Sequence, residues 1–137
     1  MACASWPNIL SDMECGRFRD LRAIHGKTPL PKEVWETAEH AAWTDHLHAC
    51  AACSDWELGC RVIERGFDPA SFPCVHIADQ VTQHCEQHPD PRDCPDALVI
   101  SVRSGEYGLP IRDGGSSASV IAYCPWCGTA LKTEVAR

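Results

Sequence analysis

The most informative pattern in this sequence is a run of potential metal ligands, His46-x3-Cys50-x2-Cys53. Residues four apart lie on the same side of a helix, so a helix ending near Cys50 would present an imidazole and a thiolate together. Cys53 could then turn back toward them. A structural zinc site needs four ligands, and Cys15 on a preceding helix is the best candidate for the fourth. We therefore predict a zinc site here; the alternative is a buried core histidine beside two incidental thiols.

A second pattern, Cys124-Pro125-Trp126-Cys127-Gly128, is typical of a zinc knuckle. In such a tight turn the backbone amides point at the two thiolate sulfurs, and the glycine permits a left-handed conformation and close approach. The alternative is a redox-active Cys-x-x-Cys, which normally opens a helix after a strand in a longer α/β domain. We therefore predict that Cys124 and Cys127 bind zinc.

The other two ligands of this second site must come from Cys74, Cys85, His88 and Cys94. Cys74 would lie far from Cys85 if the segment between them is helical. Cys85 is expected as the third ligand, while His88 and Cys94 compete for the fourth. Cys94 offers the commoner structural ligand. In a plain three-strand meander, however, Cys94 and Cys124 would lie roughly 20 Å apart at opposite ends of the sheet, which favours His88. Two complete sites predict two zinc ions per chain.

These ligands need short helices in the first half of the chain and strands in the second. Helices are expected over about 11–26, 31–46 and 54–66, from apolar residues that recur at helical spacing. The segment 68–73 breaks this pattern, and a short helix is expected over 74–85. Strand-like runs follow at 97–102, 107–111 and 118–123, and a Gly-Gly turn joins the last two.

The fold class expected from these elements is α+β. A small helical zinc module at 1–68 precedes a zinc-stapled three-stranded antiparallel β module at 69–137. Zinc in the helical module would hold together short helices that bury too little apolar surface to be stable alone.

Composition and charge narrow the class of protein. The 137 residues include ten Cys, and 12 Lys+Arg stand against 19 Asp+Glu, a formal net charge of −7. Zinc-bound thiolates add further negative charge, so binding to nucleic acid is disfavoured. No apolar run is long enough to span a membrane, and no signal-peptide pattern is visible. We therefore expect a cytoplasmic protein whose cysteines bind metal rather than form disulfides.

The first half of the chain resembles a known family. Cys15, the segment Leu30-Pro31-Lys32-Glu33 and the run 46–53 are similar to the zinc-finger segment of zinc-binding anti-sigma factors, a bacterial family. The resemblance covers about residues 11–66. It implies that Cys15, His46, Cys50 and Cys53 bind zinc. Where soluble members of that family continue into a long helix that grips the sigma factor, this chain continues into a Cys-rich β region.

The second half resembles a family of small uncharacterised bacterial Cys-rich domains, over about residues 73–132. The resemblance implies a zinc-bound fold and no particular activity. The residues that carry it are Cys74, Cys85-x2-His88, Cys94-Pro95-Asp96, Tyr107-Gly108, the segment Arg112-Asp113-Gly114-Gly115-Ser116-Ser117 and the segment 123–128.

The leading functional hypothesis is a non-enzymatic, zinc-binding regulatory or interaction protein that holds a protein partner, with an anti-sigma-like role as one form of it. A catalytic zinc keeps an open position and needs a general base, and neither cluster suggests one. Two other classes are alternatives. One is a zinc-ribbon protein that binds nucleic acid. The other is a thiol redox sensor, in which oxidation of Cys50 and Cys53 ejects zinc and melts the helical module.

Overall fold

The structure, a computed structural model, describes residues 13–103 and 105–131. The chain forms two compact units, Met1–Glu57 and Leu58–Arg137. The division falls within helix α5 (Ala51–Glu64), so one continuous helix carries residues of both units. The sequence predicted a boundary between the two modules after residue 68, and that boundary stays a prediction. Over the described residues, no helix combines the length and apolar character needed to cross a membrane.

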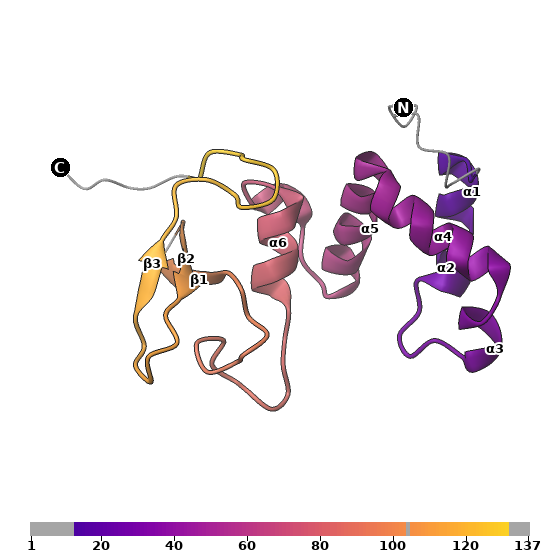
Figure 1. The fold of residues 1–137 in the computed structure, drawn as a ribbon. Coiled ribbons are helices and arrows are strands. Elements are labelled where there is room, and N and C mark those ends of the chain that lie inside the picture. Colours follow the sequence, from indigo (N-terminus) through magenta and orange to yellow (C-terminus); the bar gives the residue numbers. More distant parts are fainter. Residues whose placement is uncertain (1–12, 104, 132–137) are drawn as a thin grey trace. The chain divides into compact units, whose positions relative to one another are not determined.

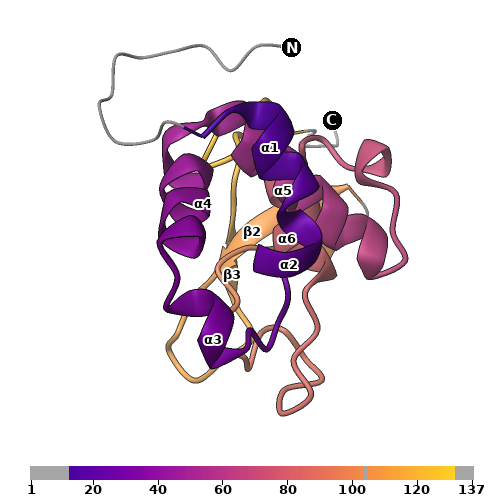
Figure 2. The ribbon, with the colours of Figure 1, turned by 90° about the vertical axis from the view of Figure 1, so that its right-hand side faces the viewer.

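The first unit is built from short helices (Figures 1 and 2). They are α1 (Cys15–Asp20), α2 (Arg22–His25), α3 (Lys32–Trp35) and α4 (Ala38–Ala49), followed by the start of α5. The single helix expected over 31–46 is two helices, because Thr37 caps the start of α4: its side chain accepts a hydrogen bond from the backbone N–H of His40 at 3.1 Å. The expected start of the first helix, at about residue 11, lies outside the described residues.

The core of this unit is small and aromatic. Phe18 on α1 stacks on Trp43 of α4 with ring centroids 4.7 Å apart, and Trp43 Nε1 donates a hydrogen bond to the Phe18 carbonyl at 3.0 Å. These contacts hold α4 alongside α1, as Figure 2 shows. Among the residues that the structure describes, the other buried members of this core cluster are Cys50 and Cys53. Two of the expected metal ligands are therefore also core residues.

The second unit combines helix and sheet. After α5 come a 3₁₀ turn, Pro69–Ser71, the helix α6 (Val75–Thr82) and three strands, β1 (Ile100–Arg103), β2 (Glu106–Pro110) and β3 (Ala118–Val120). The strands form an antiparallel sheet in the order β1-β2-β3, and α6 lies beside it in Figure 1. The expected α+β class and the expected meander are confirmed.

Gly108 allows the centre of this sheet to pack closely. It lies opposite Ile100 on β1 and opposite Val120 on β3. A Cβ at this position would lie 2.8 Å from Val102 Cγ2 and 2.9 Å from the Ser119 carbonyl oxygen. Any larger residue would therefore force the neighbouring strands to shift.

The buried core of the second unit brings the ends of its elements together. Ile77 of α6 packs with Val99, which precedes β1, and with Cys124 and Leu131 from the chain after β3. This contact brings the first turn of α6 to the Cys124 turn. Distant parts of the sequence thus meet at one end of α6.

Candidate metal centres

Three groups of Cys and His side chains occur within the described residues, each with potential ligand atoms that lie within 4.8 Å of one another. We call them the helical group, the knuckle group and the loop group. They consist, respectively, of Cys15, His46, Cys50 and Cys53; of Cys74, His76, Cys124 and Cys127; and of Cys85, His88 and Cys94. Each group is compatible with binding a metal ion, and this part of the functional prediction is confirmed.

The helical group is assembled at the junction of α4 and α5. His46 lies on α4, and Cys50 ends that helix with extended backbone angles, φ −110° and ψ 103°. The chain turns there and starts α5 at once, which carries Cys53 back toward His46. Cys15, the first residue of α1, supplies the fourth side chain. The structure brings together the four residues expected from the sequence.

Burial closes the helical group to solvent. Cys53 is 0% exposed, His46 5% and Cys50 8%. The His46 ring packs against Phe18, with centroids 5.0 Å apart. Burial lowers the pKa of His46, although a backbone hydrogen bond at Met13 opposes the shift. The imidazole is therefore held in its neutral form, which is the form that binds a metal.

Two of the three sulfurs in the helical group are paired in this structure. Cys15 and Cys50 are disulfide-bonded, whereas Cys53 keeps its thiol. A metal binds the thiolate form of cysteine, so the disulfide and the metal-bound site are mutually exclusive states of the same side chains. A disulfide here would remove two of the four potential ligands of the group.

The knuckle group joins the start of α6 to the Cys124 turn. Cys74 is the N-cap residue of α6 and His76 lies in its first turn. The turn is closed by the Gly128 N–H, which donates to the Cys124 carbonyl at 2.9 Å, and Gly128 has a φ of +72°. This left-handed conformation is the one expected of the glycine in a zinc knuckle.

The thiols of the knuckle group differ in acidity. A hydrogen bond with the Thr129 hydroxyl, at 3.0 Å, is the main cause that lowers the pKa of Cys127 to about 6. Burial is the main cause that raises the pKa of Cys74 to about 12, with a further contribution from the nearby Cys124 and Cys127 sulfurs. Several thiolates crowded together repel one another, and a divalent cation would offset that repulsion. The arrangement is thus suited to a cation.

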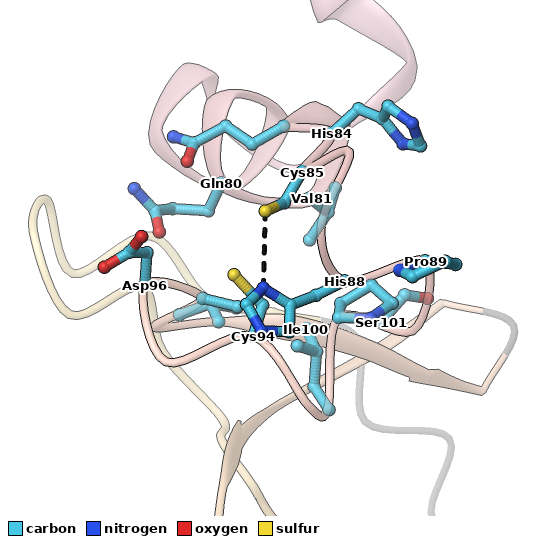
Figure 3. Close-up of a pocket in the computed structure, with 14 residues that line it drawn as sticks. Gln80, Val81, His84, Cys85, His88, Pro89, Cys94, Asp96, Ile100 and Ser101 are labelled. Carbon is cyan, nitrogen blue, oxygen red and sulfur yellow. Dashed lines mark hydrogen bonds between the residues drawn. The ribbon is translucent and has the colours of Figure 1, made fainter.

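The loop group lies on the long connection between α6 and β1, which lines a cavity (Figure 3). Cys85 and His88 follow the end of α6, and Cys94 precedes β1. The Cys85 sulfur lies 3.4 Å from His88 Nδ1, and this hydrogen bond is the main cause that lowers the pKa of Cys85. All three residues line a cavity of about 360 Å³.

The grouping in the second half of the chain differs from the expected one. Cys85 was expected as the third ligand beside Cys124 and Cys127, with His88 or Cys94 as the fourth. The structure instead places Cys85, His88 and Cys94 together in the loop group. Cys85 follows the far end of α6, whereas the knuckle turn packs against the beginning of that helix. The sequence predicted two zinc sites, whereas the described residues contain three groups of potential ligands.

His76 was not among the ligands predicted from the sequence. Cys74 was expected to lie too far from Cys85 to bind the same metal ion. The separation of Cys74 and Cys85 along α6 is confirmed, but Cys74 meets the knuckle instead. The available signal was the Cys74-x-His76 spacing at the start of a short helix. The His76 ring also stacks on Trp126, with ring centroids 6.4 Å apart. The tryptophan between the two knuckle cysteines thus helps to orient the imidazole.

Comparison with protein families gives one match. A family model described as a domain of unknown function (DUF6980) matches residues 71–136. The matched segment contains both the knuckle group and the loop group, and it begins after the helical group. Comparisons with curated proteins and with solved structures give no match.

Proposed function

We propose that this protein is a non-enzymatic zinc-binding regulatory protein that holds a protein partner, and that metal ions stabilise its two small units. The observation that supports this best is the closed helical group, in which four donors are present and Cys53, His46 and Cys50 are all buried. Structural zinc sites are tetrahedral and closed, whereas catalytic ones keep an open position. The helical group therefore suits a structural role.

The mixture of donors supports zinc over other common cations. Three thiols and one imidazole in the helical group, and again in the knuckle group, are soft and borderline ligands. Calcium and magnesium prefer oxygen ligands, whereas tetrahedral Cys/His sets are typical of zinc. We therefore propose zinc for these two groups.

The size of the first unit supports a structural need for the metal. Its buried core contains two aromatic residues, Phe18 and Trp43, and otherwise the ligands Cys50 and Cys53. Small units with so little buried apolar surface usually depend on a metal or disulfide. Removing the metal would leave thiolates in that core, so folding and metal binding are expected to be coupled.

The charge of the chain supports a protein partner rather than nucleic acid. A net charge of −7 becomes more negative when thiolates bind zinc, which opposes association with phosphate backbones. The anti-sigma-like role remains one form of this proposal, with the helical unit as the partner-binding part.

Metal analysis of reduced protein tests the proposal. We expect Cys53→Ser to lose one zinc per chain, because its sulfur is a ligand of the helical group. Cys60→Ser is the matched control, since Cys60 lies on the same helix outside the three groups and should lose none. Partner capture from the native host should then succeed with wild type and Cys60→Ser and fail with Cys53→Ser. A protein that contains no zinc when reduced would overturn the proposal.

One observation favours a second candidate, the thiol redox sensor. Cys15 and Cys50 are disulfide-bonded in this structure, whereas the sequence suggested Cys50 and Cys53 as the oxidised residues. Peroxide would oxidise two zinc-bound thiolates to a disulfide, be reduced to water or hydroxide, and release the metal. The test is zinc release on peroxide addition, followed by metal rebinding after reduction. Zinc that stays bound after peroxide treatment would exclude this candidate.

A further inference from the structure

We propose that Cys85, His88 and Cys94 form a third zinc site, whose fourth coordination position faces the adjoining cavity and binds a small thiol. This site would bind an exchangeable ligand, unlike the helical and knuckle groups, which each contain four potential ligands. The inference rests on the proposed function only in requiring that the chain takes up zinc.

The three side chains already converge on one point. The Cys85 sulfur lies 3.4 Å from His88 Nδ1, and the Cys94 sulfur lies with them within 4.8 Å. In Figure 3 the two sulfurs and the imidazole face one another across the space between the loops. Two thiolates and an imidazole are a familiar donor set for zinc.

The loop group has one donor fewer than a closed tetrahedral site. Two other potential ligands, Asp96 and His84, line the same cavity but do not belong to the group. Figure 3 shows the His84 ring directed away from the three donors. Over residues 13–103 and 105–131, no further Cys, His, Asp or Glu side chain joins the three. A tetrahedral zinc bound here would therefore take its fourth ligand from outside this set.

The cavity determines which ligand would fit. Its volume of about 360 Å³ is within the range of sites for small molecules. Val81, Val99 and Ile100 contribute apolar side chains to its wall. A thiolate from the ligand would complete a Cys₃His-type set, which is one of the common zinc sets. A small thiol thus matches both the metal and the size of the cavity, whose wall also contains polar residues such as Gln80 and Ser101.

The loop that carries Cys94 is held in place by an arginine. The Arg112 guanidinium donates hydrogen bonds to the backbone carbonyls of Arg92 at 2.6 Å, Cys94 at 2.6 Å and Ala97 at 2.7 Å. Three bonds to one loop fix its backbone around the Cys94 position. Arg112 is therefore a positioning residue for this site.

Cobalt substitution of the full chain tests the proposal. The three groups contain three, three and two thiols, so the reduced, fully loaded protein should show charge-transfer intensity from eight bound thiolates. Addition of phenylmethanethiol should raise that intensity to nine thiolates. His88→Ala should bind two metals instead of three and lose the response to the thiol. His84→Ala, a histidine of the same cavity outside the group, should keep both.

The possible outcomes separate this inference from the proposed function. Two bound metals in wild type, unchanged in His88→Ala, would overturn the third site and leave the proposed function standing. Three metals with no response to phenylmethanethiol would overturn the exchangeable position. If Asp96→Asn then gained the response, Asp96 would be the fourth ligand. A chain that binds no metal would refute the proposed function as well.

Discussion

The helical group and the knuckle group contain the same donors, three cysteines and one histidine, yet the chain assembles them in different ways. Three donors of the helical group come from one short segment, 46–53, that spans a helix junction. The knuckle group joins two pairs of donors, Cys74 with His76 and Cys124 with Cys127, across the whole sheet-forming segment. Local geometry therefore brings together three donors of the helical group, and packing of α1 adds Cys15. The knuckle group depends on tertiary packing to join its two pairs.

The two groups also differ in how many of their cysteines belong to the buried core cluster of their unit. Cys50 and Cys53 are half of the buried core cluster in the first unit. In the second unit only Cys124 belongs to the buried cluster, beside Ile77, Val99 and Leu131, and a three-stranded sheet adds further structure. We therefore expect the first unit to depend more strongly on its metal.

Metal removal should have the largest effect and should separate the two units. In reduced protein treated with a chelator, we expect the helices α1–α4 to unfold, because structural zinc contributes apparent binding energies of about 10–16 kcal/mol in small zinc domains. The β1–β3 sheet should retain part of its structure. Amide spectra recorded before and after chelation measure this difference. Equal loss of signals in both units would contradict the comparison.

A single substitution in the helical group should reproduce that effect locally. Cys50→Ser should remove one metal and unfold the first unit, because it deletes a ligand that is 8% exposed and part of the core. The strand amides at 100–120 should be unaffected, because the ligand sets do not mix. Cys60→Ser serves as control and should leave both regions folded. Collapse of the strand signals in Cys50→Ser would mean that the two units share one folding transition.

The membership of the knuckle group can be tested by two cysteine substitutions. Cys74→Ser should remove one thiolate from the knuckle site and weaken its metal binding, because Cys74 lies beside Cys124 and Cys127. Cys85→Ser should leave that site intact and affect only the loop group. Cobalt charge-transfer spectra of the two variants provide the measurement. An intact knuckle spectrum in Cys74→Ser together with a changed one in Cys85→Ser would restore the grouping expected from the sequence.

The smallest effect is expected from backbone conformation at two glycines. Gly128→Ala should destabilise the second unit by about 1–2 kcal/mol, because an L-residue disfavours the φ of +72° found in the knuckle turn. Gly16→Ala should stabilise α1 by about 0.5–1 kcal/mol, because a Cβ there meets no atom within 4 Å and alanine favours a helix. Thermal unfolding of the metal-loaded variants checks both signs. A stabilising Gly128→Ala would show that the turn does not require its glycine.

Those features of the fold and of the candidate sites that depend on a few neighbouring residues could be predicted from the sequence. The spacing of His46, Cys50 and Cys53 placed three donors correctly, because a helix and its end determine their relative positions. The Cys124–Gly128 motif likewise predicted a tight turn with a left-handed glycine. The meander followed from alternating runs and a Gly-Gly turn, so the α+β class was also accessible.

Tertiary structure alone decided which loop donors meet. Cys74 and Cys85 are separated by α6, and the packing of Ile77 with Cys124 selects the end of that helix that faces the knuckle. The sequence of a loop without a periodic pattern does not predict which residues the loop contacts. Residue type therefore could not show whether Cys74 or Cys85 lies beside Cys124 and Cys127. The long-range burial of a few apolar side chains made that choice, because it determines where each loop comes to lie.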